Sequence, residues 1–329
     1  MPILANNDFT GSELTAIIND VQQPQQPLQS LGLFDAKGVR TTGIKVERKA
    51  QGLQLVQTSA RGSSSGTDMN HATRDMVTFE SVRLMVKDTL QPADIQNIRQ
   101  FAADDDELIE VRAELAERAQ RMRDTLDANL ERMRFGAIKG QVLDADGSVI
   151  FDMFQKFGYT QTKKAIQFGT GGNLEAQVLA AKNAADKATT GKLRKGYMAL
   201  CGAGFTDKLH TDDEFKRAYD RYQDSAQART DMRDRIAYKN IDWIKCDDGI
   251  GSELYIPEDK AYLFPVIPQM FIERYTPGDI MWAVNQRGLP FYMTQEDLKH
   301  DMGVEIWGRS FPIILNTIPQ GVIELSISA

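Results

Sequence analysis

The sequence predicts an α+β fold, in which helices and strands are partly segregated along the chain. A strong helical periodicity runs through residues 104–134, and residues 173–238 are predicted to be mainly helical. Residues 41–88 show the alternation of apolar and polar residues that is typical of strands, and residues 241–329 contain short apolar runs broken by glycine and proline. A doubly wound parallel sheet needs a regular alternation of strand and helix, which this chain lacks.

Composition narrows the function before any motif is considered. The chain has 329 residues, enough for one large or two ordinary domains, and its 39 basic against 46 acidic residues give a net charge of −7. An acidic chain repels phosphate backbones, which disfavours a classical nucleic-acid binder. The first ten residues lack a signal-peptide pattern, and no run approaches the roughly 18 apolar residues that span a bilayer. We therefore expect a soluble, intracellular protein with no membrane partner.

The N-terminal region combines a short helix with an extended arm. Thr10–Glu13 is a polar start, and an amphipathic set of apolar residues follows it at helical spacing: Leu14, Ile17, Ile18 and Val21. The next segment, Gln22–Pro27, contains two prolines, which fix φ and remove hydrogen-bond donors. We expect this segment to be an extended arm that reaches a neighbouring chain.

Residues 41–88 are predicted to form a long two-stranded hairpin. Its tip, Thr58–Thr67, is rich in Ser and Gly and has almost nothing to bury. An isolated two-stranded ribbon is marginally stable, so this one needs a surface to lie on. The hairpin is locally basic, which fits either a solvated face or an intermolecular contact; the residues that make it so are Arg40, Lys45, Arg48, Lys49 and Arg61.

A single long helix is predicted over residues 104–134, about 46 Å at 1.5 Å per residue. Acidic residues lie at its start and Arg132 and Arg134 at its end, and these charges complement the helix dipole. Gly136, just beyond, suits a C-cap. Glu114 with Arg118, and Glu117 with Arg121, form i,i+4 pairs. Because no second helix of this kind is present, packing on a sheet is favoured over a coiled coil. The apolar stripe comprises Leu108, Val111, Leu115, Ala119, Met122, Leu126, Leu130 and Met133.

Three short motifs raise chemical possibilities. Gly140–Ile150 is predicted to be a hairpin whose Asp144-Ala145-Asp146-Gly147 turn lacks the other ligands of a calcium loop. The glycine-rich stretch Phe168–Asn173 precedes a helix, but it lacks the P-loop lysine and the third glycine of a dinucleotide fingerprint, so a loop with Asn173 as N-cap is favoured over nucleotide binding. Cys201, nine residues before His210, has the small apolar neighbours of an inert buried cysteine.

With only two cysteines, Cys201 and Cys246, and three isolated histidines, neither a disulfide framework nor a zinc module is expected. The scarcity of histidine also lowers the expectation of acid–base catalysis. We therefore predict no catalytic, cofactor-binding or metal-binding residues and no cofactor.

The order of parts resembles the phage major capsid proteins of the Hong Kong 97 fold, and specifically the lambda-type major capsid protein E family. An arm, a hairpin with a Ser/Gly tip, one long helix, a second hairpin, a mixed domain and returning strands follow one another. The resemblance covers nearly the whole chain and depends on pattern rather than a short motif. It is carried by Thr41–Glu47, Arg61–Ser65, Leu115–Met133, Ala261–Pro265, Glu273–Tyr275, Glu305–Leu315 and Pro319–Leu325.

The resemblance implies a division of the chain into five parts. They are an N-terminal arm (1–40), an E-loop hairpin (41–90), a peripheral domain (91–164) with its spine helix (104–134), an axial domain (165–265), and return strands that complete the axial and peripheral domains (266–329).

The resemblance also implies the function of a major head protein of a tailed double-stranded DNA phage or prophage. Hexamers and pentamers of one chain would form an icosahedral shell that encloses DNA without sequence-specific binding. The expected partners are the chain itself and the scaffold, portal and decoration proteins, in the virion and, during assembly, the host cytoplasm. The expected inter-subunit contacts are Arg40, Lys45, Arg48, Lys49, Arg61, Gly62 and Ser63.

Two alternatives stay open at this point. An encapsulin-like bacterial compartment shell would share the fold, and a cytosolic enzyme would use the Gly169–Asn173 loop to bind nucleotide. Some relatives cross-link their subunits, but no feature of the sequence marks Lys45 or Lys49 as reactive, so no such bond is predicted.

Overall fold

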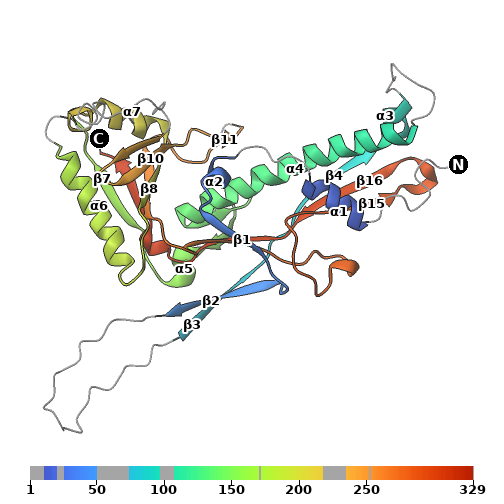
Figure 1. The fold of residues 1–329 in the computed structure, drawn as a ribbon, viewed down its shortest axis with the longest axis horizontal. Helices are drawn as coiled ribbons and strands as arrows, with labels where there is room; N and C mark the ends of the chain where they lie inside the picture. Colours follow the sequence, from blue (N-terminus) through green and yellow to red (C-terminus); the bar gives the residue numbers. More distant parts are fainter. Residues whose placement is uncertain are drawn as a thin grey trace, which may run out of the picture.

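The subunit is elongated, with two units placed along one long helix (Figure 1). The computed structural model describes residues 11–20, 26–49, 74–96, 107–169, 172–217, 235–251 and 253–328. Side chains are not described for residues 47–49, 74–75, 95–96, 107–113 and 301. The description below applies to these ranges.

The long helix, α4 (Glu107–Lys139), has 33 residues and is therefore about 50 Å long. From Leu115 to Met133 every member of the predicted apolar stripe is buried, which confirms the stripe, and the Arg118–Glu114 pair is present at 2.8 Å. The predicted C-cap at Gly136 is wrong. Gly136 lies inside α4, and glycine suits this position because a Cβ there would lie 2.8 Å from the Gln141 carbonyl oxygen. The helix ends at Lys139 and is followed by Gly140, whose φ is +93°.

Two three-stranded sheets pack against α4 and form the first unit, as predicted for a helix that packs on a sheet. In β16, Val304, Ile306 and Gly308 are buried toward α4, and a Cβ at Gly308 would lie 3.4 Å from the Met122 sulfur. The intervening residues of β16 point to the opposite face. In the first sheet the strand order is β15 (Tyr292–Asp297), β16 (Val304–Ser310), β4 (Leu84–Leu90). In the second sheet it is β1 (Phe34–Gly38), β14 (Phe271–Tyr275), β17 (Pro312–Asn316).

A two-stranded ribbon projects from this unit (Figure 1). Strands β2 (Gly43–Lys49) and β3 (Arg74–Glu80) pair antiparallel, which confirms the predicted hairpin. The predicted hairpin extended too far, because β4 leaves the ribbon and pairs with β16 instead. The break in alternation between Phe79 and Val82 marks the point where the chain changes sheets.

The N-terminal region contains the predicted helix, α1 (Gly11–Asp20), and a short helix, α2 (Pro27–Ser30). The prediction that Gln22–Pro27 contains no regular element is wrong at Pro27. Proline at the first helical position lacks only a donor that would have no helical partner, and its φ suits the helix. Residues 21–25 lie outside the described residues.

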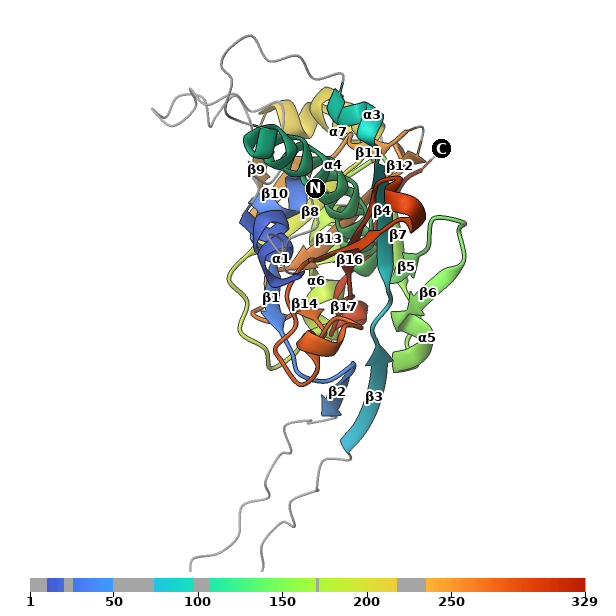
Figure 2. The ribbon, with the colours of Figure 1, turned by 90° about the vertical axis from the view of Figure 1, so that its right-hand side faces the viewer.

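The second unit is a six-stranded sheet covered by helices (Figure 1), and in Figure 2 it lies behind the first unit. One face packs against α6 (Leu174–Ala188) and α7 (Ala203–Thr211), and the other contacts Phe135 and Ile138 of α4. The strand order is β7 (Thr162–Ile166), β18 (Ile323–Ile327), β13 (Lys260–Pro265), β8 (Tyr197–Cys201), β10 (Ile241–Lys245), β9 (Arg235–Tyr238).

Strand β8 corrects the prediction of a mainly helical 173–238 region. All five of its residues are buried, since the strand lies in the middle of the sheet with helices on both faces. A short, fully apolar run gives no alternation that distinguishes a strand from a buried helix.

The remaining elements are short. The hairpin predicted at Gly140–Ile150 is confirmed, and in its turn Asp146 accepts a hydrogen bond from the Ser148 amide at 2.8 Å.

Among the helices of the described residues, none is both long and apolar enough to cross a membrane. The other elements are α3 (Pro92–Gln96), β5 (Gln141–Leu143), β6 (Val149–Asp152), α5 (Met153–Phe157), β11 (Gly249–Ile250), β12 (Glu253–Leu254), η1 (Met281–Ala283), η2 (Lys299–Asp301) and η3 (Pro319–Gly321).

Candidate assembly surfaces and the anchor of the N-terminal segment

The described part of the N-terminal segment, residues 11–20 and 26–38, packs on the first unit. The Thr15 hydroxyl lies between the backbone groups of Met293: it donates to the carbonyl oxygen (3.3 Å) and accepts from the amide (3.1 Å). The Asn19 amide donates to the Phe291 carbonyl at 2.9 Å. Further on, β1 pairs in parallel with β14. This segment is therefore integrated into the fold of its own subunit.

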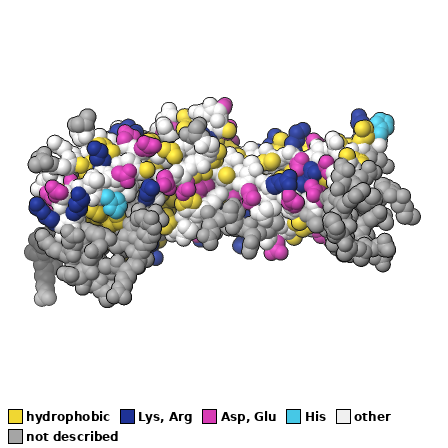
Figure 3. Space-filling model, turned by 90° about the horizontal axis from the view of Figure 1, so that it is seen from above, with side chains coloured by type: hydrophobic (Ala, Val, Ile, Leu, Met, Phe, Trp, Pro, Cys, Tyr) yellow, Lys and Arg dark blue, Asp and Glu magenta, His cyan; other side chains and the backbone are white. Residues whose placement is uncertain are grey.

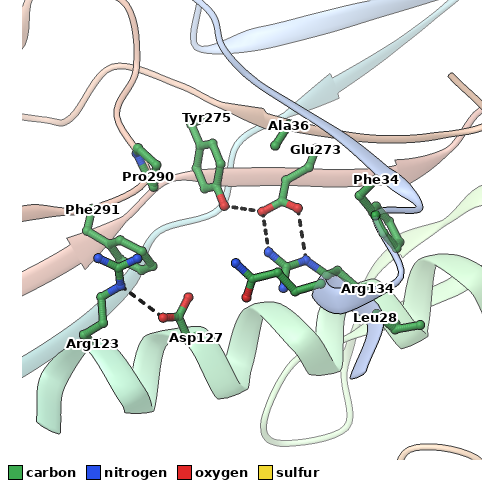
Figure 4. A pocket seen from close by; sticks show the side chains of 12 residues that line it. Leu28, Phe34, Ala36, Arg123, Asp127, Arg134, Glu273, Tyr275, Pro290 and Phe291 are labelled. Carbon is green, nitrogen blue, oxygen red and sulfur yellow. Dashed lines mark hydrogen bonds and ion pairs between the residues drawn. The ribbon is translucent and has the colours of Figure 1, made fainter. Parts of the chain in front are cut away.

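A buried charge cluster fastens this segment to α4. We define the cluster as Arg123, Asp127, Glu131 and Arg134 of α4 with Glu273 and Tyr275 of β14; Figure 4 shows these residues except Glu131. Arg123 donates to Asp127 at 3.0 Å and to the Ile18 carbonyl, and its guanidinium lies 4.5 Å from the centre of the Phe291 ring.

The second half of the cluster is centred on Arg134. Its guanidinium makes two hydrogen bonds to Glu273, at 2.9 and 3.0 Å, and one to Glu131 at 2.9 Å. The Glu131 carboxylate also accepts a hydrogen bond from the Leu28 amide at 2.6 Å, and the Tyr275 hydroxyl donates to Glu273. One network thus joins α2, the C-terminal part of α4 and β14, which are far apart in sequence.

Burial shapes the ionisation of the cluster. Burial raises the pKa of Asp127 and of Glu131, and their arginine neighbours oppose this rise without cancelling it. Burial lowers the pKa of Arg134, but the Glu273 carboxylate reverses that effect, so the net pKa is raised. Burial and the Glu273 charge raise the pKa of Tyr275 well above its usual value. Beside these groups lies a pocket of 190 Å³ whose lining is partly polar, which suits ordered water.

Sequence reasoning missed this cluster. Arg132 and Arg134 were expected to complement the helix dipole, and that expectation is wrong for both. Arg134 is buried between Glu131 and Glu273, and Arg132 donates to the Asp144 carbonyl at 2.7 Å and pairs with Glu253 at 3.0 Å. The sequence does contain a pattern that could have indicated the cluster, a second stripe of charged residues on the helix. Its members recur at intervals of three or four: Arg123, Asp127, Glu131 and Arg134.

The ribbon has a different base. Phe79 of β3 is fully buried and lies edge-on to Phe151, with a ring-centre distance of 5.7 Å, and 5.9 Å from Phe157. The Lys156 ammonium lies 5.0 Å from the centre of the Phe79 ring and donates to the Thr78 carbonyl at 3.4 Å. Phe79 is thus the fully buried apolar anchor of the described ribbon, and the partly buried Ile44, Val46 and Val77 pack against the same core.

The outer face of the ribbon is solvent-exposed. Strand register places Lys45 opposite Thr78, and both are exposed, as is Met76 two residues earlier. Met76 is 59% exposed, so this face carries a large apolar side chain in contact with solvent. Of the predicted contact residues, Arg40 precedes β2 and is exposed; Arg48 and Lys49 lie in β2 without described side chains; and Arg61, Gly62 and Ser63 lie outside the described residues.

The motifs that suggested chemistry have structural explanations. Asn173 caps α6 by accepting a hydrogen bond from the Ala176 amide at 2.8 Å, as predicted. The Gly169 amide donates to the Asp212 carboxylate at 3.0 Å, which places a negative charge beside the glycine loop and disfavours phosphate. Cys201 is buried, as predicted, and burial raises the pKa of its thiol well above the usual value. Within the described ranges, no group of three or more His, Cys, Asp or Glu side chains could hold a metal ion.

These features define a class of protein. A projecting ribbon, a long helix across a small sheet and a separate sheet unit are the parts of a phage capsid subunit of the Hong Kong 97 fold, and solved capsids share this arrangement. A prophage capsid protein of E. coli CFT073 aligns with a TM-score of 0.59 at 15% identity, over 97% of this chain and 99% of that one. The capsid of Myoviridae phage XM1 aligns with a TM-score of 0.53 at 8% identity, over 94% of both chains.

The family follows from the sequence comparisons. The family model described as phage major capsid protein E matches residues 10–327, and the chain belongs to this family. The major capsid protein of Pseudomonas phage KPP10 is 25% identical over 264 residues, which are 78% of this chain and 73% of that protein. The predicted fold class and family are confirmed, and the role of phage or prophage major capsid protein is supported over the compartment-shell and enzyme alternatives.

Proposed function

We propose that copies of this chain assemble as hexamers and pentamers into a closed icosahedral shell that encloses double-stranded DNA. The observation that carries this proposal is the ribbon, whose outer face exposes Lys45 and Met76. A two-stranded ribbon is marginal by itself, so a surface from another subunit is the natural completion of this one. Many copies of one modest contact then give a stable shell.

The division of labour within the chain follows the family pattern. Residues 1–40 and 41–90 act as the arm and the E-loop, with Arg40, Lys45, Arg48, Lys49, Arg61, Gly62 and Ser63 at inter-subunit contacts. The peripheral domain (91–164) and the axial domain (165–265) are completed by residues 266–329. In support, β14, β16 and β17 lie in the first unit, whereas β18 lies in the six-stranded sheet.

The role is structural rather than catalytic, with scaffold, portal and decoration proteins as further partners and the host cytoplasm as the place of assembly. On the face that Figure 3 shows, basic and acidic side chains are interspersed among the described residues. A net charge of −7 with this mixed distribution suits a shell that surrounds DNA without binding its sequence.

The test is to express the full chain alone and to measure its size by light scattering and negative-stain electron microscopy. We expect shells, tubes or capsomer rings. A chain that remains monomeric over the whole accessible concentration range, also when co-expressed with the other head proteins of its phage or prophage, contradicts the proposal. Deletion of Arg61–Thr67 should leave a folded subunit that assembles poorly, and normal full-sized shells from this variant would contradict the E-loop assignment.

A further inference from the structure

The buried charge cluster has one carboxyl group more than it has guanidinium groups. The carboxyl groups belong to Asp127, Glu131 and Glu273 and the guanidinium groups to Arg123 and Arg134, and each of these residues is at most 5% exposed. With every one of these groups ionised, the cluster carries a net charge of −1 in the protein interior. An uncompensated buried charge is strongly destabilising, so the folded subunit gains from one further positive charge at this place.

The hydrogen bonds indicate which carboxyl group can hold that charge as a proton. Both oxygens of Glu131 accept hydrogen bonds, from a backbone amide and from Arg134, and both oxygens of Glu273 accept from Arg134. Asp127 accepts from Arg123 through Oδ2, at 3.0 Å, and no described group donates to its Oδ1 atom. A proton on Glu131 or Glu273 would displace a donor, whereas a proton on Oδ1 of Asp127 displaces none.

Asp127 also lines the pocket of 190 Å³ beside the cluster, where water can accept a hydrogen bond from a protonated carboxyl group. In Figure 4 one oxygen of Asp127 is joined to Arg123, and the other points away from it. One wall of the pocket is the N-terminal segment itself, which contributes Leu28, Phe34 and Ala36 to the lining. A change of charge at Asp127 therefore acts on the surface against which the segment packs.

The environment of Asp127 contains charged groups from α4 and β14. The lining that α2, β1 and the loop before β15 contribute to the pocket is uncharged. Of the charged groups, the two arginines favour an ionised Asp127, but Arg134 is already shared by two other carboxylates. Burial outweighs both arginines and raises the pKa of Asp127. The charged and titratable groups around Asp127 are Arg123, Glu131, Arg134 and the exposed Asp124 on α4, with Glu273 and Tyr275 on β14.

We propose that Asp127 is a proton switch for the N-terminal segment. With a proton on Oδ1 the cluster is neutral, and α4 holds the segment through the Ile18 carbonyl and the Leu28 amide. When the proton passes to water in the pocket, a net charge of −1 remains, and the ionised carboxylate competes with the Ile18 carbonyl for Arg123. The segment therefore loosens as the pH rises. The switch belongs to the single subunit and does not depend on assembly.

Hydrogen exchange at graded pH tests the switch on the unassembled full chain. After correction for the intrinsic effect of pH on exchange, the protection of α1 and α2 should fall as the pH rises from 3.8 through the raised pKa of Asp127. The fall should approach about tenfold for each pH unit in that range. Asp127→Asn, which has no proton to lose at this position, should abolish most of the fall. The matched control, Glu117→Gln on the exposed side of α4, should behave as the wild type.

Infrared spectroscopy detects the proton itself, because a protonated carboxyl group has a C=O stretch that a carboxylate lacks. The difference spectrum between the wild type and Asp127→Asn should contain this band, and the band should disappear over the pH range in which α1 and α2 lose protection. If Asp127→Asn does not fold, the wild-type protein alone still decides, because the carboxyl band and the protection must change together.

Three results would overturn the switch. The first is the absence of the carboxyl band, and the second is a loss of the band that leaves the protection of α1 and α2 unchanged. The third is protection that depends on the replacement of sodium by choline at fixed pH and ionic strength, because a bound cation would then supply the missing charge. Each of these results leaves the proposed assembly function untouched, since all measurements are made on the single subunit.

Discussion

The N-terminal segment and the ribbon are both extensions of the first unit, yet they are held by opposite means. The segment contributes the Ile18 carbonyl and the Leu28 amide to the buried charge cluster. Each arginine and each carboxylate of that cluster has a partner within 3.0 Å. The ribbon is held at its base by Phe79, while Lys45 and Met76 remain exposed. One extension is completed within the subunit, and the other offers its surface to a partner.

This contrast separates folding from assembly. A buried ion pair contributes little net stability compared with apolar residues of the same shape. Removal of one partner, however, leaves an uncompensated charge in the interior, which strongly destabilises the folded state. Substitutions in the charge cluster should therefore act on the free energy of unfolding. Substitutions on the outer ribbon face should leave that quantity unchanged and act on association.

The largest expected effect is that of Arg134→Met. The substitution leaves Glu131 and Glu273 buried side by side without a cation, so we expect the free energy of unfolding to fall by about 3–5 kcal/mol. Urea denaturation of the unassembled subunit measures this change. Arg121→Met on the exposed side of the same helix, where Arg121 pairs with Glu117, should cost less than about 0.5 kcal/mol. Equal losses in the two variants would mean that the cluster does not anchor the segment.

The sequence predicts the local parts of this contrast and not the cluster. Alternation at Ile44 and Val46 and the stripe from Leu115 to Met133 depend only on neighbours along the chain, and both predictions are confirmed. Arg134 and Glu273 are 139 residues apart, and no local pattern indicates their pairing. Strand β8 was missed for a related reason, since burial on both faces erases the periodicity that identifies a strand.

The ionisation of Asp127 should make the free energy of unfolding depend on pH in the way expected of a buried carboxyl group, in contrast to an exposed one. Burial raises its pKa in the folded state above the ordinary 3.8, so the folded protein retains the proton while the unfolded chain loses it. As pH rises from 3.8 through the raised pKa, the wild type should lose stability relative to Asp127→Asn. Each unit of the pKa rise corresponds to about 1.4 kcal/mol. Urea denaturation of both proteins at closely spaced pH values measures the difference.

Asp35 of β1 provides the control of opposite sign. Its hydrogen bond from Lys37, with the contribution of Arg274, lowers its pKa, so its stabilising effect is present above pH 3.8 and is lost as pH falls through the lowered value. The free energies of unfolding of Asp35→Asn and of the wild type should therefore converge only at pH below 3.8. The same direction of change for both variants would contradict the assignment of Asp127 to a desolvated site.

A smaller effect is expected for Phe79→Leu at the base of the ribbon. The substitution keeps an apolar side chain but removes the edge-on contact with Phe151 and the cation contact with Lys156, so we expect a loss of about 1 kcal/mol. Hydrogen exchange should show faster exchange confined to β2 and β3. Uniformly faster exchange across the first unit would show that the ribbon is as integrated as the N-terminal segment.

The smallest effect on the subunit is expected for Met76→Ser, three residues earlier on the same strand and on the opposite face. Because Met76 is 59% exposed, its loss should change the free energy of unfolding by less than about 0.5 kcal/mol. Assembly should nevertheless weaken, since each of many identical contacts loses the same apolar area and these losses multiply across a shell. Light scattering at graded concentrations should show a higher threshold for assembly in Met76→Ser, at unchanged urea midpoint. A normal threshold would mean that this face of the ribbon remains in solvent in the shell, and the distinction between a completed and an offered extension would then apply only to residues nearer the tip.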